Sequence, residues 1–290
     1  MAKKTYLGIN GVAEEIPKGY IGIDGVARKI KKVYIGDENG KAKECWSSLE
    51  IVSWATGTDE QIAAMVAASD AGVIDLYDYW SVGDERKVRL SAITSSNWSY
   101  GEETHSAQTV TFVLMNKGGK TLASGGTCKF VVGLKNCLSV KGWINFADVS
   151  SGGFPQMSRR GWYDTDFRNA IPATLRGIFK QHINYCNVGD SSVKPGTIGS
   201  TVDYFAPPAV VEVLGNNGNY SMDGEGTQFE WYKTTANQLK KLGDSGSKAN
   251  YWTRSKQTYN NTNMCLINTN GVCTTTRPSS FLGLTMFGCI

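Results

Sequence analysis

The chain has 290 residues, of which 41% are hydrophobic and 19% are charged, and its 33 glycines and 8 tryptophans are typical of a loop-rich globular protein. This composition can bury a sizeable core, and it excludes an intrinsically disordered chain and a coiled coil. The formal net charge of +4 is small for this length and part of it lies in Lys29, Lys31 and Lys32, so no nucleic-acid partner is predicted.

The first 46 residues contain an internal repeat. Tyr6, Tyr20 and Tyr34 are spaced by 14 residues, and each opens a unit with apolar residues around an Asn-Gly or Asp-Gly pair. Such pairs accept the positive φ angles of a tight hairpin turn. A unit this short cannot bury its own apolar face, so the hairpins must stack on each other or on a partner. The repeat therefore predicts a module of β-hairpins over residues 1–46. This module is either an attachment module for a larger assembly or a meander packed on its own domain.

From residue 47 the pattern changes to mixed elements. Thr58 provides N-cap chemistry, and the spacing of Ile62, Met65 and Val66 predicts a helix that ends near Gly72. A strand and a turn are expected over 73–84, and strands over 86–90, 109–115 and 129–134.

The second half of the chain has helical segments followed by short strands. Helices are predicted over 165–170, from Pro172 to about residue 182, and over 228–242. Only short strands and turns follow. Helices in the middle with strands on both sides predict an α+β domain over residues 47–290.

Residues with catalytic chemistry are sparse. His105 and His182 are the only histidines, and neither has the neighbours of a metal site. No phosphate-binding glycine loop and no Gly-x-Ser-x-Gly motif is present. The carboxylates Asp164 and Asp166 are of a kind that any surface provides. The sequence therefore predicts no catalytic residue, no metal site, no cofactor and no enzymatic activity.

The seven cysteines form no CxxC pair, and their number is odd. We expect buried, reduced thiols rather than a disulfide framework. The start of the chain lacks the apolar stretch of a signal peptide, and no segment has the 18 apolar residues of a membrane span. Synthesis in a cytoplasm is expected, without membrane insertion.

Several motifs carry a resemblance to known proteins. The unit Tyr20 to Lys32 resembles the N-terminal repeats of tail proteins in prophages of gut bacteria. The middle of the chain is similar to a domain common in those phages. The segments that carry this similarity are Tyr79-Trp80 with Gly83-Asp84, Gly161-Trp162 with Arg168, Asp203-Tyr204-Phe205, and Tyr251-Trp252-Thr253-Arg254-Ser255. The segment from Gly283 to Ile290 is similar to the C-terminal strand of variable proteins that are diversified by retroelements. One departure is the threonine-rich segment 274–276, where such proteins often carry asparagine runs.

The resemblance implies a C-type-lectin-like fold for residues 47–290 and a place in the virion tail. It implies binding of a host cell-surface protein or glycan through a hypervariable surface at about 259–282. Residues 1–46 would contact other phage tail proteins, and the chain would be a homo-oligomer, with a trimer as the expected state.

The composition of the window is consistent with diversification. Randomising the adenines of Asn codons cannot produce Lys, Glu, Gln, Met or Trp. These five types make up about a fifth of the residues before Thr258, but only Met264 belongs to them between Tyr259 and Gly283. An ordinary polar loop remains the alternative interpretation.

Two sets of residues follow from this interpretation. A binding face must tolerate substitution, so it should lie on exposed loops and strand faces above a rigid scaffold. The residues predicted to face the ligand are Tyr259, Asn260, Asn261, Asn263, Leu266, Val272, Thr274, Thr275, Thr276, Arg277, Ser280, Phe281 and Leu282. The predicted scaffold residues are Trp252, Met264, Ile267, Met286, Phe287 and Cys289.

Two other functions stay open. The chain could be a structural tail or surface protein whose lectin-like domain only packs against its neighbours. Formylglycine-generating enzymes share the lectin-like fold family and use cysteines, which invites a comparison with Cys265, Cys273 and Cys289. Nothing in the sequence around these three marks a lowered thiol pKa.

Overall fold

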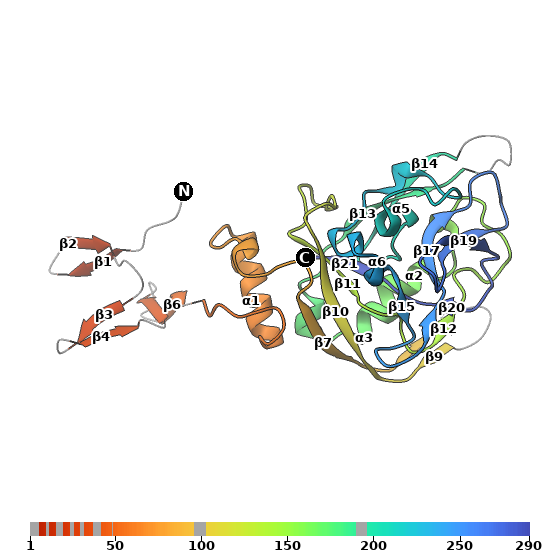
Figure 1. Ribbon diagram of the computed structural model, residues 1–290. Helices are drawn as coiled ribbons and strands as arrows, with labels where there is room; N and C mark the ends of the chain where they lie inside the picture. Colours follow the sequence, from red (N-terminus) through yellow and green to blue (C-terminus); the bar gives the residue numbers. More distant parts are fainter. Residues whose placement is uncertain are drawn as a thin grey trace.

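The fold is seen in a computed structural model, which describes residues 6–9, 12–15, 20–23, 26–29, 32–36, 42–47, 49–95, 103–189 and 196–290 (Figure 1). Several antiparallel sheets and a few short helices make up these residues, so the predicted α+β class is confirmed at this level. Within the described residues, no helix has the length and apolar character needed to cross a membrane.

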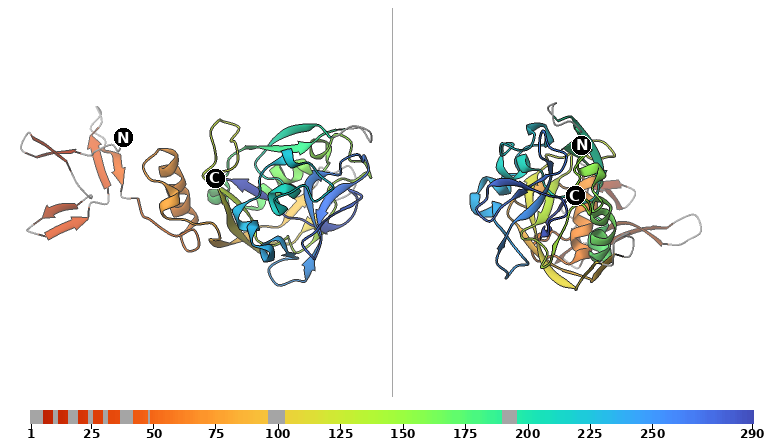
Figure 2. Two further views of the ribbon diagram at one scale, coloured as in Figure 1. Left: turned by 45° about the horizontal axis from the view of Figure 1, so that its top comes forward. Right: turned by 90° about the vertical axis from the view of Figure 1, so that its right-hand side faces the viewer.

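The N-terminal repeats form three β-hairpins. Their strands are β1 (Tyr6–Ile9) with β2 (Val12–Glu15), β3 (Tyr20–Ile23) with β4 (Val26–Lys29), and β5 (Lys32–Gly36) with β6 (Ala42–Ser47). Each pair is a separate two-stranded sheet, so the predicted hairpins are confirmed but strand pairing does not join them to one another. Figures 1 and 2 show them beyond helix α1, away from the main body of the chain.

Helix α1 (Asp59–Asp70) begins and ends where the sequence predicts. The Thr58 side chain accepts a hydrogen bond from the Gln61 N–H (3.3 Å), and the Gln61 side chain accepts one from the Thr58 N–H (2.7 Å). This capping box satisfies N–H groups that have no partner inside the helix. Gly72, with φ +70°, follows the C-terminal end.

The strand predicted over 73–84 is wrong. The Asp75 side chain accepts a hydrogen bond from the Tyr77 N–H (3.1 Å) and starts a 3₁₀ turn, η1 (Leu76–Asp78). Leu76 and Trp80 are thereby both buried, and the Trp80 indole donates a hydrogen bond to the Val52 carbonyl (2.9 Å). The Tyr79 and Trp80 N–H groups both donate to the Leu76 carbonyl (3.1 and 2.9 Å), and such local backbone bonds exclude an extended conformation here.

A four-stranded antiparallel sheet lies at the centre of the main body. Its order is β21 (Phe287–Cys289), β11 (Phe130–Leu134), β10 (Gln108–Lys117) and β7 (Glu85–Leu90). The strands predicted at 86–90, 109–115 and 129–134 are confirmed. Strand β21 ends the chain, and the buried Ile290 carbonyl accepts hydrogen bonds from the Lys129 and Phe130 N–H groups (2.7 and 3.3 Å).

Both faces of this sheet are covered by apolar side chains. On one face, Phe112 and Leu114 of β10 join a large core with α1 and the short helices around Trp162. On the other face, Val113 and Met115 join a second core cluster. A strand that is buried on both sides has a nearly continuous apolar sequence, which β10 shows from Val110 to Met115.

The helical region after residue 150 is broken into short pieces. Their bounds are η2 (Phe154–Gln156), α2 (Arg160–Trp162), the π-helical turn η3 (Tyr163–Phe167), α3 (Arg168–Ala170) and α4 (Ala173–Arg176). The helix expected from Pro172 to about residue 182 is therefore too long. After Gly177 the backbone turns to strand pairing, because the Ile183 N–H donates to the Thr121 carbonyl (2.9 Å) rather than to a helical partner.

The remaining elements of the main body are also short. Two more hairpins are β8 (Ile93–Ser95) with β9 (Glu103–His105), and β13 (His182–Asn187) with β14 (Ile198–Asp203). The helical turns are α5 (Val210–Leu214) and η4 (Asp223–Glu225).

The long helix predicted over 228–242 is wrong. It is replaced by η5 (Glu230–Lys233), α6 (Thr235–Gln238) and the hairpin of β15 (Lys240–Lys241) with β16 (Lys248–Ala249). The side chains of Gln228 and Gln238 donate hydrogen bonds to the Tyr232 carbonyl (3.3 and 2.9 Å), which a continuous helix would have used internally. Thr234 is extended, with ψ 114°, and separates the two turns.

The C-terminal part forms a five-stranded sheet. Its order is β12 (Lys141–Gly142), β20 (Leu282–Gly283), β17 (Tyr251–Lys256), β18 (Met264–Ile267) and β19 (Cys273–Thr276). Strands β17 and β20 are parallel, the other pairs are antiparallel, and β19 is an edge strand. The window 259–282 therefore occupies one end of this sheet and the turns that connect its strands.

Candidate ligand-binding surface

Most residues that were predicted to face a ligand are accessible. Tyr259, Val272 and Phe281 expose 53%, 56% and 62% of their surface, and Arg277 is exposed as well. The other accessible members are half-buried: Asn260, Asn261, Asn263, Thr274, Thr275, Thr276, Ser280 and Leu282. These residues lie on the β17–β18 turn, the β18–β19 turn, the edge strand β19, the loop before β20 and the first residue of β20.

Leu266 is the exception, and its prediction as a ligand-facing residue is wrong. It lies in β18, which has β17 on one side and β19 on the other. Successive side chains of a strand point to opposite faces of the sheet. Here Met264 and Leu266 join the first core cluster, whereas Cys265 and Ile267 join the second. Because both faces of β18 are covered, Leu266 is only 3% exposed.

The six predicted scaffold residues are all buried, with at most 1% of their surface exposed. Trp252 is held by packing and by a hydrogen bond from its indole N–H to the Gly142 carbonyl (2.9 Å), which joins β17 to β12. Phe287 and Cys289 lie in β21 and Met286 directly before it, so they belong to the central sheet rather than to the window's own sheet.

Two exposed residues of the window were missed. Thr262 and Asn270 are at the tips of the two turns. The Asn260 side chain accepts hydrogen bonds from the Thr262 N–H (2.7 Å) and hydroxyl (2.9 Å), and the Asn268 side chain accepts them from the N–H groups of Asn270 (2.9 Å) and Val272 (3.1 Å). The two acceptor asparagines thus shape the turns, as short polar side chains often do. Turn chemistry in the sequence could have identified both tips.

Tyr259 has a left-handed backbone conformation with φ 59°. This region is unfavourable for most side chains, but asparagine is enriched in it. A bulky aromatic ring is therefore held outward at a turn position where asparagine would be less strained.

A segment distant in sequence forms one border of the window. The Ile144 and Asn145 N–H groups both donate to the Pro278 carbonyl (3.0 and 3.2 Å), and the Ser150 N–H donates to the Asn261 carbonyl (2.7 Å). Between these points Arg277 pairs with Asp148 (3.0 Å). Residues 143–150, which we call the border segment, are therefore bound to the window by backbone hydrogen bonds near both ends and by an ion pair between them.

The border segment adds its own exposed apolar side chains. Phe146 and Val149 expose 45% and 48% of their surface. Asp148 also accepts a hydrogen bond from the Ser279 hydroxyl, which is the main cause of the lowered pKa of Asp148, and Arg277 adds to it. No motif in the sequence marks these residues, because their relation to the window arises only from folding.

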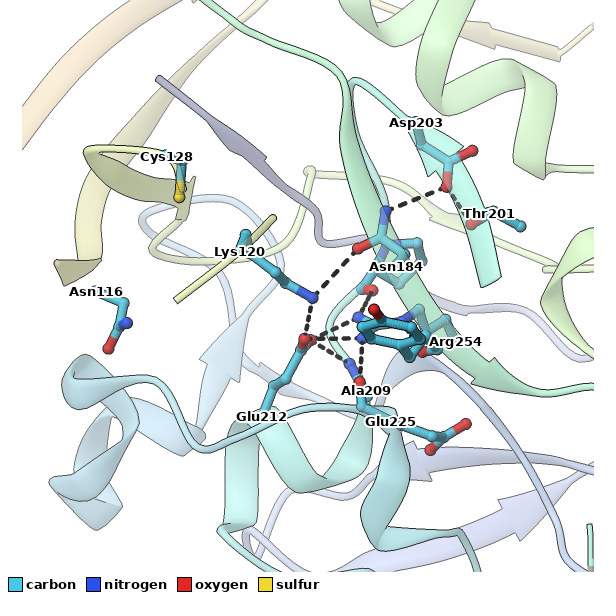
Figure 3. A network of polar contacts seen from close by, with 12 residues as sticks. Asn116, Lys120, Cys128, Asn184, Thr201, Asp203, Ala209, Glu212, Glu225 and Arg254 are labelled. Atoms are coloured by element: carbon cyan, nitrogen blue, oxygen red, sulfur yellow. Dashed lines mark hydrogen bonds and ion pairs between the residues drawn. The ribbon is translucent and has the colours of Figure 1, made fainter. Parts of the chain in front are cut away.

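The Tyr-Trp-x-Arg-Ser segment of β17 carries a buried charge network (Figure 3). The Arg254 guanidinium donates two hydrogen bonds to the Glu212 carboxylate (2.5 and 2.8 Å), and Lys120 forms an ion pair with the same carboxylate. Further donor bonds from Arg254 reach the carbonyls of Tyr185 (2.9 Å) and Glu225 (2.8 Å). One side chain thus joins β17 to α5, β13 and η4.

The electrostatics of the network follow from this geometry. Burial by itself would raise the pKa of Glu212, but the charges of Arg254 and Lys120 outweigh it and lower the pKa to about 2. Burial raises the pKa of Glu225 to about 7, although the Ser255 hydroxyl and Arg254 oppose the increase. Arg254 and Glu212 have no exposed side-chain surface, so the network holds the scaffold and does not meet a ligand.

The histidines and cysteines also lie inside. Both His105 and His182 are buried, and burial lowers the pKa of His182 to about 3. Six cysteines are buried free thiols: Cys128, Cys137, Cys186, Cys265, Cys273 and Cys289. Burial raises the pKa of Cys137 and Cys186 to about 12, and the pKa of Cys265 is raised by its contact with Cys273 and by burial. In the described part of the chain, no group of three or more His, Cys, Asp or Glu residues is placed to hold a metal ion.

A comparison of the chain with protein-family models, with curated proteins and with solved structures found no match.

Proposed function

We propose that this chain is a non-enzymatic receptor-binding subunit of a phage tail, with a variable ligand-binding surface at residues 259–282. The observation that carries the proposal is the distribution of exposure inside this window. Turn and edge-strand residues such as Tyr259, Val272 and Phe281 are accessible, while Met264 and Ile267 between them are buried. A surface of this kind can change its side chains without changing its core.

The C-type-lectin-like fold is part of the proposal. It is supported by the resemblance of the segment Gly283 to Ile290 and by the course of the chain. Strand β21 ends the chain inside the central sheet, next to β11. The window is thus bounded by β17 and its buried network on one side and by β20 and β21 on the other. Fixed ends on both sides would allow the residues between them to vary.

The chemistry of the exposed residues fits binding to a large surface. Tyr, Phe and Arg supply most of the binding energy at many interfaces, and Asn, Ser and Thr provide adaptable hydrogen bonds. Tyr259, Arg277 and Phe281 would be the anchors here, and the border segment would enlarge the face with Phe146 and Val149. A host cell-surface protein or a glycan would be the ligand, and several copies on a tail would add avidity.

Sequencing this locus in several phage isolates tests the proposal. We expect substitutions to cluster at the accessible positions of 259–282 and to spare Met264, Leu266 and Ile267, although these three lie inside the window. An adjacent reverse transcriptase with a template copy rich in Asn codons would be the expected companion. Uniform drift over the whole domain would contradict the proposal and favour a structural tail or surface protein with a non-diversified lectin-like domain.

A further inference from the structure

A separate cavity lies on the central sheet, away from the window. It has a volume of about 390 Å³, which is within the range of small-molecule sites. One wall is the β7–β10 pair, where Lys87 lies directly opposite Thr111. The other wall comes from η5, α6 and the segment after β15, and none of the lining residues belongs to 259–282. Figure 1 shows β7 and β10 on the opposite side of the main body from β19.

The cavity has a fixed frame. The Lys241 N–H donates to the Asn136 side chain (3.1 Å). The Cys137 N–H donates to the Lys241 carbonyl (2.9 Å), and the Gly243 N–H donates to the Cys137 carbonyl (3.0 Å). Behind this wall the buried Lys240 ammonium donates to the carbonyls of Leu134 (2.5 Å) and Lys135 (3.0 Å). These contacts attach the β15 segment to the end of β11 and hold the cavity open.

The acidic side chains of the cavity already have partners. One oxygen of Asp244 accepts from the Thr111 hydroxyl (2.7 Å), and the other accepts from the Asn136 amide (3.1 Å). Glu85 forms an ion pair with Lys135 (2.7 Å). The charge of Glu85 is thus balanced by Lys135, whereas Asp244 keeps its negative charge and only its hydrogen-bonding oxygens are occupied.

Two cations of the cavity have no such partner. Lys87 and Lys241 line it, are exposed, and form no ion pair with any described residue. Together with the paired groups, the lining carries three lysines and two carboxylates, so its formal charge is positive. An anionic group is therefore the preferred partner for this end of the cavity.

The rest of the lining suits a polyhydroxylated ring. Trp231 contributes a half-buried aromatic side chain, and Leu239 extends the apolar part. Asn237 uses its amide N–H for the Trp231 carbonyl (2.8 Å), which leaves its side-chain oxygen as an acceptor for a ligand hydroxyl. An aromatic face with a few convergent polar groups is a frequent arrangement in sites for small molecules.

We infer that this cavity is a second ligand site, which takes an acidic sugar residue by pairing its carboxylate with Lys87 and Lys241 and placing its ring against Trp231. The site is independent of the variable window, because it shares no residue with it. The same chemistry is present in a free uronic acid and in the terminal residue of an acidic polysaccharide.

Calorimetric titration and saturation-transfer NMR of the full chain with D-glucuronate test the inference, with D-glucose and acetate as reference ligands. We expect saturable binding of glucuronate, and binding at least about tenfold weaker for glucose, which lacks the charge, and for acetate, which lacks the ring. A glucuronate-terminated oligosaccharide that binds at least as tightly as the monosaccharide would identify a glycan as the source. Stronger binding of the free monosaccharide would identify the small acid.

Matched variants locate the site. The double variant Lys87→Met, Lys241→Met keeps the aliphatic stems and removes both charges, and it should weaken glucuronate binding at least about tenfold. Lys141→Met removes the charge of an exposed lysine on β12, outside the cavity, and should leave glucuronate binding unchanged. Unaltered melting curves exclude unfolding as the cause. Absence of saturable glucuronate binding to the parent chain, equal binding of acetate, or full binding by the double variant would overturn the inference, whereas failure of the window proposal would leave these results unaffected.

Discussion

Arg254 carries its charge into a part of the core that solvent does not reach, and the chain surrounds it with acceptors. The Glu212 carboxylate and three backbone carbonyls are among them. Buried charges are tolerated when they are paired and hydrogen-bonded, and breaking such a pair leaves an uncompensated charge. Arg254 is fully buried, so its role is to hold the surrounding elements together.

The two carboxylates of this network should respond to pH in opposite ways. The pKa of Glu212 is lowered to about 2 from its usual 4.5, so its stabilising effect is present above pH 4.5 and is lost as the pH falls toward 2. The pKa of Glu225 is raised to about 7, so its protonated form stabilises the fold below pH 4.5, and this effect is lost as the pH rises through 7.

Glu225→Gln should therefore remove a pH dependence. An amide keeps the hydrogen bond from the Asn187 N–H and can donate to Ser255, and it does not ionise. We expect the variant to be more stable than the parent at pH 8 by about 1–3 kcal/mol, and equal to it near pH 4.5. Urea unfolding at several pH values measures this. Glu212→Gln is the control, with a loss of about 3–5 kcal/mol at pH 7, and a parallel pH dependence of parent and Glu225→Gln would contradict the assignment.

Two apolar residues of the window offer a direct test of which side chains belong to the surface. Phe281 is 62% exposed, whereas Leu266 is 3% exposed. Phe281→Ala should change the free energy of unfolding by no more than about 0.5 kcal/mol. Leu266→Ala should cost about 2–5 kcal/mol, because it leaves a cavity beside Trp252 and Met264. Chemical unfolding of both variants decides the matter, and equal losses would show that Phe281 is part of the core.

At the scale of elements, the border segment and the loop before β20 support each other. Their hydrogen bonds join backbone groups that are more than a hundred residues apart in the chain. Neither segment has a regular element of its own between β12 and η2 or between β19 and β20. Each is therefore ordered by the other, with Asp148 as the side chain between Arg277 and Ser279.

Removing this side chain should loosen the loop without unfolding the domain. In Asp148→Ala we expect faster amide hydrogen exchange for Ser280, whose N–H donates to the Arg277 carbonyl, and a nearly unchanged melting temperature, because the bonds from Ile144 and Asn145 to the Pro278 carbonyl remain. The Ile62 N–H in α1 serves as an internal reference. Since the pKa of Asp148 is lowered, the parent should keep the contacts of Asp148 with Arg277 and Ser279 down to pH values below 3.8. Unchanged exchange in the variant would show that Asp148 does not order the loop.

At the scale of the whole molecule, the N-terminal hairpins and the rest of the chain have separate sheets. The described strands before residue 48 pair only within their own hairpins. Isolated two-stranded hairpins are marginally stable in water, so a partner surface is expected for them. Copies of the same chain would provide it, or, under the proposed function, other proteins of a phage tail.

Deleting residues 1–46 should therefore abolish assembly and keep the remaining domain folded. By light scattering after size-exclusion chromatography we expect the full chain as an oligomer, with a trimer as the expected state, and the truncated chain as a monomer. The melting transition of the main body should persist in the truncated chain. A truncated chain that keeps the oligomeric state would place the interface elsewhere, and loss of the transition would show that the hairpins are part of the core.

The sequence by itself determined the features that depend on short-range chemistry. These include the hairpins around the Asn-Gly and Asp-Gly pairs, the capped helix after Thr58, and the apolar strands of the central sheet. Each follows from turn residues, a cap or a run of apolar residues within about a dozen positions. The window residues were assigned in a different way, from the resemblance and from the near-absence of Lys, Glu, Gln, Met and Trp between 259 and 283, and most of them are accessible.

Only the tertiary structure decided the features that depend on long-range contacts. Leu266 is buried because its strand has covered faces on both sides, and the helix expected over 228–242 is broken because side chains use its carbonyl groups. The Lys120–Glu212–Arg254 network and the pairing of Asp148 with Arg277 join residues that no local pattern relates. The physical reason is that burial and charge pairing depend on which segments meet in space, and local periodicity does not contain that information.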